Sequence, residues 1–331
     1  MGLYLYCVAG NKSHIDLQES IMPVTPVNLS GTKILVTGPT GQVARPVVEH
    51  YARIADVYAL ARFSKEQDVA DMEAMGATLL RADLADPDAI ALIPDDFDYV
   101  LNFAVVKSGD FEYDLAANAE GLGFLMSHCR KVRAFLHFSS TAVYQYSGQE
   151  PRRESDPLGD NHRAMFPTYS ISKIAAETVC RFVARQQNIP TTIARLSVPY
   201  GDNGGWMYYH MLMMQGGIPI DIHPQGPNYY NLLHTDDYIE KIPYLLAAAT
   251  PQVTTTNFGG SSKTSIEQWC AYITELTGFE AIFNETETAF GSLHIDTNRM
   301  HELIGETRVD WRDGIRRQLQ CLAPQVLKSR Q

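Results

Sequence analysis

The sequence predicts an α/β protein in which a doubly wound parallel sheet is accompanied by a smaller C-terminal lobe. Three observations support this prediction. Short apolar, β-branched runs alternate with longer helical patterns, a glycine-rich turn follows the first of these runs, and 331 residues are enough for more than one folding unit.

The alternation gives six expected strands, and right-handed crossovers between them make the sheet parallel. The expected strands are residues 33–37, 57–61, 77–80, 99–104, 134–138 and 191–196, and the first helix is expected at about residues 42–54. The strands are apolar on both faces, which is typical of a sheet covered by helices on each side.

The turn after the first strand reads Gly38-x-x-Gly41-x-x-Ala44. Glycines let the backbone turn tightly and let a pyrophosphate approach the helix N-terminus, where free N–H groups favour negative charge. An ordinary tight turn could also use glycines. The strand–turn–helix context nevertheless favours a dinucleotide-binding Rossmann fold.

The choice of dinucleotide is expected at the end of the second strand, where an acidic residue would accept hydrogen bonds from the adenosine ribose. Here the strand ends in Ala61 and Arg62, and Asp56 lies at its opposite end. A guanidinium suits the 2′-phosphate of NADP, so we expect NADP, with NAD possible. The alternative interpretation is that Arg62 is a solvated loop residue.

Tyr169 and Lys173 lie four residues apart in a helical run and therefore share one helix face. An ammonium near a phenol would lower the tyrosine pKa and make it a proton donor or acceptor near neutral pH. Such spacing also occurs by chance. It gains weight because the fifth strand runs into Ser139 and Ser140, which places hydroxyls at the carboxyl edge of the sheet.

Together these segments resemble the extended short-chain dehydrogenase/reductase family, in its NAD(P)-dependent epimerase/dehydratase-like branch, from about Thr32 to at least Gly260. The motifs that carry the resemblance are Thr37-Gly38-x-x-Gly41-x-x-Ala44, Asp83-Leu84, Asn118-x-x-Gly121, Ser139-Ser140-Thr141-Ala142-Val143-Tyr144, Tyr169-x-x-x-Lys173, Arg195-Leu196-Ser197-Val198-Pro199-Tyr200-Gly201 and His234-Thr235-Asp236-Asp237.

The resemblance implies a catalytic set of Tyr169 as acid/base, Lys173 as its partner and ribose ligand, Ser140 on the reacting oxygen, and Asn118. For Asn118 two roles stay open, a proton relay or a polar residue that distorts its helix. The resemblance also implies a homodimer packed through the helices that carry Asn118 and Tyr169.

The expected binding residues form two groups. The cofactor set is Gly38, Thr40, Gly41, Gln42, Val43, Arg62, Asp83, Leu84, Ala104 and Pro199, with Tyr169 and Lys173. The substrate set is Ser140, Thr141, Trp206 and Tyr230. The aromatic and methionine-rich run at 206–214 is expected mainly to pack the core of the lobe, with part of it facing the substrate.

The sequence departs from the sugar-nucleotide members of the family in three ways. Thr141 follows Ser140 where dehydratases carry an acid, Tyr230 or Asn231 stands where an arginine would grip a diphosphate, and Arg62 replaces an acid. We therefore expect an NADP-preferring oxidoreductase that acts on a non-nucleotide carbonyl or alcohol. The alternative is a nucleotide-sugar epimerase with tightly bound NAD, and the third possibility is a non-catalytic dinucleotide-sensing regulator.

Composition narrows the partners. The 27 Lys+Arg against 38 Asp+Glu give a net charge of −11, which argues against nucleic acid. The five cysteines are scattered and fit a reduced, cytoplasmic protein. Neither a metal-ligand cluster nor a long apolar span is apparent, so we expect no metal and no membrane partner, only a small-molecule substrate.

The predicted organisation has three parts: an N-terminal extension at 1–30, with translation starting at Met1 or Met22; a dinucleotide-binding domain at 31–198 plus 229–258; and a substrate-binding lobe at 199–228 plus 259–331.

Overall fold

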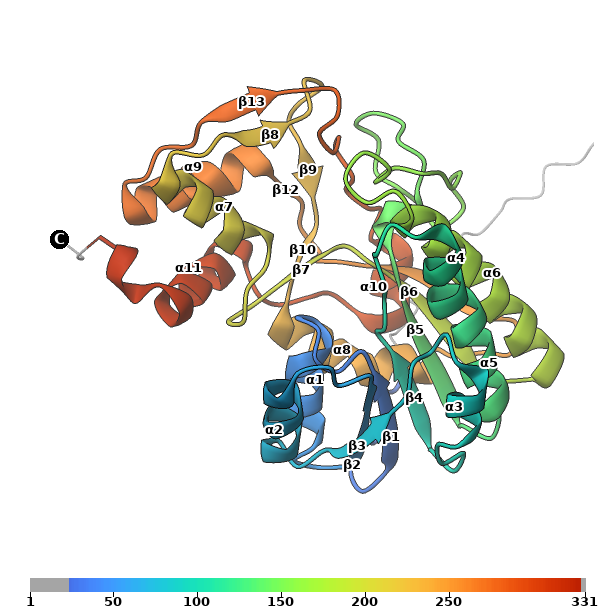
Figure 1. The fold of residues 1–331 in the computed structure, drawn as a ribbon. Coiled ribbons are helices and arrows are strands. Elements are labelled where there is room, and N and C mark those ends of the chain that lie inside the picture. Colours follow the sequence, from blue (N-terminus) through green and yellow to red (C-terminus); the bar gives the residue numbers. More distant parts are fainter. Residues whose placement is uncertain (1–23, 329–331) are drawn as a thin grey trace, which may run out of the picture.

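The computed structural model describes residues 24–328, in which seven parallel strands form one central sheet (Figure 1). Its order is β11-β6-β5-β4-β1-β2-β3. The strands are β1 (Lys33–Thr37), β2 (Asp56–Ala61), β3 (Thr78–Arg81), β4 (Tyr99–Asn102), β5 (Ala134–Ser140), β6 (Thr191–Leu196) and β11 (Thr254–Phe258). The chain runs outward from β1 to β3, returns to β4 beside β1 and then runs the other way, so the predicted doubly wound fold is confirmed.

All six predicted strands are present: β1 and β6 have the predicted ends, and the ends of the other four differ by one or two residues. β4 stops at Asn102 rather than residue 104, because the chain leaves the sheet there. β5 continues to Ser140, since Ser139 and Ser140 pair with Arg195 and Leu196 of β6. The seventh strand, β11, arose from the segment 229–258, in which no individual strand was predicted.

Helices cover both faces of the sheet because successive strand residues point to opposite sides. Ile34 and Val36 pack in one core with α1 (Ala44–Tyr51), α2 (Glu66–Ala74), α8 (Thr235–Ala247) and α10 (Asn298–Ile304). Leu35 packs in the opposite core with α3 (Pro87–Ala91), α5 (Gly121–His128) and α6 (Tyr169–Gln187). The short α4 (Phe111–Leu115) and a π-helical turn, η1 (Ala116–Glu120), lead into α5.

Local sequence explains several helix ends. Asp86 accepts hydrogen bonds from the first backbone N–H groups of α3, and Pro87 begins that helix. Asn188 adopts a left-handed conformation, with φ of 56°, and ends α6. Ser265 and Gln268 form a capping box at the start of α9 (Ile266–Thr277).

The lobe packs α7 (Trp206–Gly216), α9 and α11 (Trp311–Leu322) around a separate apolar core (Figure 1). Short strand pairs complete it: β8 (Ile220–Ile222) with β13 (Phe283–Glu285), and β9 (Tyr229–Tyr230) with β12 (Thr264–Ser265). A third pair, β7 (Val198–Tyr200) with β10 (Leu232–His234), lies between the central sheet and the lobe (Figure 1). Two short 3-10 turns remain: η2 (Thr141–Val143), which follows β5, and η3 (Pro324–Val326), which follows α11.

The aromatic and methionine-rich run forms α7. Met207, His210, Met211 and Met214 are buried, whereas Tyr209 is exposed. Most of the run therefore packs the lobe, as expected.

We propose that the chain divides into domain and lobe near the predicted boundaries, with refinements at three places. Residues 229–230 pair with β12 of the lobe, and α10 packs against α8 and β11 of the sheet. Residues 24–30 belong to the fold, because Leu29 is buried and the backbone N–H of Val24 donates to the carbonyl of Leu303. The possible start at Met22 lies outside the described residues.

Two further findings concern the described residues. None of their helices combines the length and apolar character needed to cross a bilayer. Their cysteines are free thiols, of which Cys129, Cys180 and Cys270 are buried and Cys321 is exposed; Cys7 lies outside the described residues.

A buried ion pair joins α6 to the sheet. The Glu177 carboxylate accepts two hydrogen bonds from the Arg195 guanidinium, at 2.9 and 2.8 Å, and one from the Ser139 hydroxyl at 2.6 Å. Arg181 donates to it as well, at 2.8 Å. Burial raises the pKa of Glu177, but the hydrogen bonds and charge of Arg195 and the other donors outweigh burial and hold this pKa at about 2.

Glu177→Gln is expected to lower the free energy of unfolding by about 3–5 kcal/mol at pH 7, because it leaves Arg195 buried without its counter-ion. The folded pKa lies below the ordinary value of 4.5, so the wild-type contribution is present above pH 4.5 and is lost as pH falls toward 2. Urea unfolding should therefore show a smaller difference in the free energy of unfolding between the wild type and Glu177→Gln at pH 3.5 than at pH 7.

The matched control is Glu49→Gln, which breaks the exposed pair between Glu49 and Arg53. It should cost no more than about 1 kcal/mol. Equal losses in the two variants would contradict the role given to the buried pair.

Candidate active site

The glycine-rich turn has the shape that a dinucleotide phosphate needs. Gly38 has φ of +63°, and a Cβ atom there would lie 2.9 Å from Cα of Ala104, so a side chain is excluded. The Gly41 N–H donates to the Gly38 carbonyl at 3.0 Å, which closes the turn just before α1. The turn therefore leaves open space for phosphate at a helix N-terminus, and these residues fit a dinucleotide.

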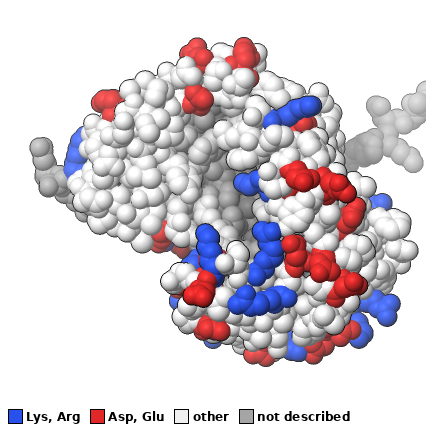
Figure 2. Space-filling model, viewed as in Figure 1, with Lys and Arg blue, Asp and Glu red and all other residues white. Residues whose placement is uncertain are grey.

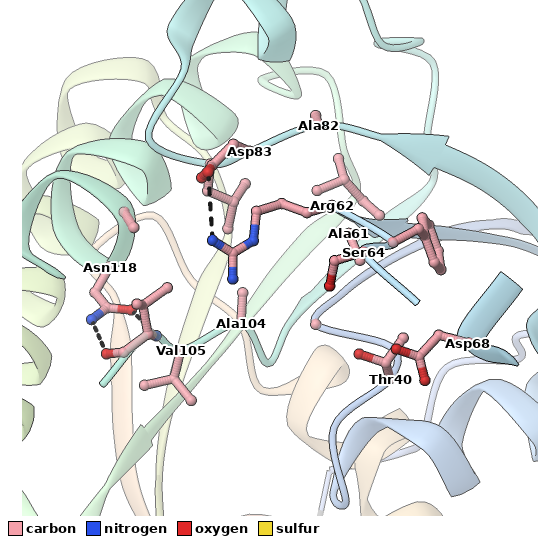
Figure 3. Close-up of a pocket in the computed structure, with 16 residues that line it drawn as sticks. Thr40, Ala61, Arg62, Ser64, Asp68, Ala82, Asp83, Ala104, Val105 and Asn118 are labelled. Atoms are coloured by element: carbon pink, nitrogen blue, oxygen red, sulfur yellow. Dashed lines mark hydrogen bonds and ion pairs between the residues drawn. The ribbon is translucent and has the colours of Figure 1, made fainter. Parts of the chain in front are cut away.

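The first of two adjoining pockets opens beside this turn and has a volume of about 180 Å³ (Figure 3). Thr40, Arg62, Asp83, Leu84 and Ala104 line it, as expected for an adenosine site. Sequence reasoning missed Phe63, Ser64 and Asp68, which also line it, because they follow β2 without a recognisable pattern.

Arg62 reaches across this pocket toward Asp83 (Figure 3), with a guanidinium-to-carboxylate distance of 3.8 Å. It also donates to the Tyr113 hydroxyl at 2.6 Å, and Tyr113 donates to Asp83 at 2.9 Å. The arginine is 58% exposed at its side chain, so its charge remains accessible to an anion. Arg62 therefore lines the pocket while its side chain stays largely exposed to solvent.

Asn118 lies in η1, where the helix is locally wider than an α-helix. Its side chain accepts from the Val106 N–H at 2.7 Å and donates to the Val106 carbonyl at 2.8 Å and the Ser172 hydroxyl at 3.1 Å. These bonds tie the loop after β4 to α6. They favour the helix-distorting, positioning interpretation of Asn118 over the proton relay.

The second pocket, of about 510 Å³, shares Gly38 and Val105 with the first and extends toward the lobe. Ser140 and Tyr169 both line it, at the end of β5 and the start of α6. Burial raises the pKa of Tyr169, and a hydrogen bond with Ser140 partly counters this. A hydroxyl pair at the carboxyl edge of the sheet can bracket one carbonyl or alcohol oxygen.

Lys173 lies one helical turn beyond Tyr169 but lines neither pocket. Its ammonium is buried and donates to the Phe138 carbonyl at 2.8 Å. Burial lowers its pKa to about 8, the Glu177 charge opposes this, and the Lys107 charge adds to it. This ammonium is thus engaged by the backbone, and burial is the larger influence on the pKa of Tyr169.

A polar network lies behind the site. The Thr37 hydroxyl donates to the Asn102 side-chain oxygen at 2.6 Å, and the Asn102 amide lies 2.9 Å from Nδ1 of His137. The Ala104 N–H donates to Thr37 at 3.1 Å, which sets the path of the chain leaving β4. Burial lowers the pKa of His137 to about 3, so the network is neutral near pH 7.

Two polar residues of the second pocket were missed by sequence reasoning. Lys107 follows β4, and His162 lies in the loop before α6 with its ring stacked on Phe290 at a centroid distance of 4.1 Å. Burial lowers the pKa of His162 to about 4, and the Lys107 charge adds to this effect. Neither residue belongs to a motif, and only the fold brings them near Tyr169.

The structure brings nearly all the predicted site residues to these two pockets. The remaining predicted cofactor residues, Gly41, Gln42, Val43 and Pro199, and the predicted substrate residues Thr141, Trp206 and Tyr230 line the second pocket. Tyr230 uses its hydroxyl internally, donating to the Gly291 carbonyl at 2.8 Å. Among residues 24–328, no group of three or more His, Cys, Asp or Glu side chains is placed to hold a metal ion.

The charge distribution agrees with an anionic ligand. Figure 2 shows a hollow between the lobe and the sheet domain, with basic side chains along its lower edge. The protein has a net charge of −11, so this local excess of positive charge is a property of the hollow rather than of the whole surface.

The sheet, the glycine turn and the hydroxyl pair define an enzyme of the dinucleotide-binding α/β class. The sequence model of the NAD dependent epimerase/dehydratase family matches residues 34–259, and the chain belongs to this family. The family inferred from the motifs is thereby confirmed.

Two relatives illustrate the range of the family. The Arabidopsis thaliana trifunctional UDP-glucose 4,6-dehydratase/UDP-4-keto-6-deoxy-D-glucose 3,5-epimerase/UDP-4-keto-L-rhamnose-reductase is 25% identical over 238 residues, which are 64% of this chain and 35% of that protein. The dTDP-4-dehydrorhamnose reductase of Burkholderia thailandensis is 29% identical over 187 residues, which are 50% of this chain and 55% of that protein. The match thus spans only part of the length of each relative.

Solved structures share the fold. The UDP-glucuronic acid 4-epimerase of Bacillus cereus, in complex with UDP-glucuronic acid and NAD, superposes with a TM-score of 0.74 at 20% identity over 87% of this chain and 98% of that one. The UDP-glucose 4-epimerase of Thermotoga maritima gives a TM-score of 0.74 at 19% identity over 88% and 99%.

Gly38→Ala is expected to weaken binding of NADPH and NADH by at least about 10-fold, because the new methyl would push the turn off Ala104. The matched control is Gly31→Ala. Gly31 has a similar φ of +68°, but nothing lies within 4 Å of its Cβ position. Both variants carry a backbone cost of about 1 kcal/mol in unfolding experiments. Equal dinucleotide affinity in the two variants, measured by fluorescence titration, would refute the role of the turn.

Proposed function

We propose that this protein is an NADP-preferring oxidoreductase that transfers hydride to or from the carbonyl or alcohol carbon of a small, non-nucleotide substrate. The observation that carries the proposal is the lining of the second pocket. Among the described residues, Lys107 is the only Lys, Arg, Asp or Glu that lines it, and aromatic and aliphatic side chains make up much of the rest.

A nucleotide-sugar substrate would bring a diphosphate, whose natural partner is an arginine. Tyr230 and Asn231 stand at the positions where such an arginine would be expected, and both side chains form hydrogen bonds with other parts of the protein. Asn231 donates to the Gly260 carbonyl at 2.8 Å and accepts from the Ile295 N–H at 2.9 Å. The pocket must also hold the nicotinamide end of the cofactor, so its volume of about 510 Å³ favours a small substrate.

Each site residue has a role in this reaction. Ser140 donates a hydrogen bond to the substrate oxygen, and Tyr169 gives a proton to that oxygen in reduction or takes it in oxidation. Lys173 lines neither pocket, so we give it the role of a positive charge behind Tyr169, one helical turn away, rather than that of a ribose ligand. When bound, the dinucleotide supplies the hydride donor or acceptor.

The NADP preference rests on Arg62. Arg62 lines the first pocket together with Ser64 and Thr40 (Figure 3), and a guanidinium with hydroxyls suits a 2′-phosphate. The strand β2 ends in Ala61 rather than in an acidic residue. The carboxylates of Asp68 and Asp83 also line this pocket, and Asp83 pairs with Arg62.

Tyr169→Phe is expected to reduce kcat by about 100-fold to 10,000-fold, because it removes the proton donor, with dinucleotide affinity changed less than about 3-fold. Tyr209→Phe is the control, since Tyr209 lines the same pocket but is 57% exposed. Absorbance at the NADPH band with a panel of aldehydes and ketones measures turnover. Wild-type turnover in Tyr169→Phe would exclude its catalytic role and would favour a dinucleotide-sensing regulator.

Arg62→Gln is expected to weaken NADPH binding by about 10-fold to 100-fold and NADH binding far less, because only NADPH carries the 2′-phosphate. The control, Arg53→Gln, removes an exposed guanidinium that pairs with Glu49. Titration of both dinucleotides gives the comparison. An equal loss for both would assign Arg62 to the shape of the pocket and leave the preference for NADP without support.

A second candidate is a nucleotide-sugar epimerase with tightly bound NAD, which the names of the relatives and of the structures with the same fold favour. The two candidates differ in the fate of the cofactor. Conversion of a UDP- or dTDP-sugar without any net change in NADPH absorbance would support the epimerase and overturn the oxidoreductase.

We also propose a homodimer packed through α5 and α6. Phe124 on α5 and Phe182 on α6 are 44% and 63% exposed, which suits a covered apolar face. The mass in solution, by light scattering, tests this assembly.

A further inference from the structure

Among the described residues, Lys107 is an ammonium without an acidic partner. Its Nζ lies 4.4 Å from the ring centre of Phe166 and 5.4 Å from that of Tyr169. The residue is exposed to solvent, and partial desolvation by the pocket walls still lowers its pKa, with no carboxylate in the described part of the chain to offset this. Besides solvent, the two aromatic rings are the groups that stabilise its charge there. It therefore lies beside Tyr169 as a cation that an arriving anion could pair with.

The position of this charge is close to the reacting centre. Lys107 lowers the pKa of both Lys173 and His162, so its field reaches the side chains on either side of Tyr169. His162 itself has a pKa of about 4 and is uncharged near pH 7. Lys107 is consequently the single fixed cation that lines this pocket among the described residues.

The rest of the pocket is suited to an apolar body. The rings of Phe166, Trp206 and Phe290 and the side chains of Met165 and Leu293 line it. Trp206 and Phe290 lie at a centroid distance of 6.2 Å, so they form a continuous aromatic wall.

We propose that the substrate is a carboxylate-bearing carbonyl compound or alcohol with an apolar or aromatic body, and that Lys107 pairs with its carboxylate. This inference rests on the proposed oxidoreductase function. In the reduction, bound NADPH would supply the hydride for the new C–H bond and be oxidised to NADP⁺, while Tyr169 would give its proton to the oxygen as the C=O double bond becomes a C–O single bond. The carboxylate takes no part in bond making and fixes the orientation of the substrate in the pocket.

A phosphate of the cofactor could also be the anion that pairs with Lys107, so the test must distinguish a substrate carboxylate from a cofactor phosphate. We would measure binding and turnover of 4-oxo-4-phenylbutanoate and of its methyl ester, which differ in charge but share the apolar body. Both are added to the full-length protein loaded with NADP⁺ for calorimetry or with NADPH for turnover, and the dinucleotide affinity is measured separately.

The acid should bind at least about 10-fold more tightly than the ester to the wild-type protein. Lys107→Met should remove this difference and leave NADPH affinity within about 2-fold, whereas Lys107→Arg should retain most of it. Lys263→Met is the matched control, because Lys263 stacks on Tyr229 at 4.2 Å outside the pocket. It should behave as wild type.

Equal affinity for acid and ester, or no binding of the acid, would overturn the inference. A loss of NADPH affinity in Lys107→Met with no change in the preference for acid over ester would also overturn it and assign Lys107 to a cofactor phosphate. Reduction of both compounds at equal rates would leave the oxidoreductase standing without this substrate class. Lys107-dependent binding of the acid without any reduction would support the carboxylate site while the proposed function fails.

Discussion

The buried pair of Glu177 and Arg195 is the interaction on which the geometry of the site depends. It ties α6 to β6, and through Ser139 it also reaches β5, one residue before Ser140. The two hydroxyls that would bracket a substrate oxygen lie on different elements, one ending β5 and the other beginning α6. A carboxylate that accepts from both β5 and β6 holds those elements in register. Removing a charge from such a pair is costly, whereas the pair itself contributes little net stability, so position is its main effect.

The same region explains how the cleft can be positive in an acidic protein. Glu177 is fully engaged by its arginines and does not line either pocket, whereas Lys107 and Arg62 do. The network behind the site is neutral because burial keeps His137 unprotonated. In the second pocket Lys107 has no counter-ion among the described residues, whereas in the first pocket Arg62 is paired with Asp83. An anionic dinucleotide would supply the missing charge.

Sequence reasoning placed residues correctly where their positions follow from the ends of consecutive strands. Gly38, Ala104, Ser140 and Tyr169 each lie just after a strand or at a helix start, and parallel strands bring all such ends to one edge. It could not find Lys107, His162 or Phe290, because these come from loops with no periodic pattern. The π-helical turn around Asn118 and the return of α10 to the sheet were also beyond it, since both are set by tertiary packing rather than by local propensity.

This contrast separates what the family determines from what this chain determines. The pocket at Arg62 and the hydroxyl pair are built largely from motif residues, so membership of the family accounts for dinucleotide chemistry. The walls of the second pocket come mainly from segments outside the motifs, among them the loop before α6, α7 and the stretch around Phe290. We therefore expect substrate choice to depend more on these segments than on the motif residues. Lys107 is the most specific feature of the set among the described residues, because a charge without a counter-ion discriminates between ligands more sharply than apolar contact does.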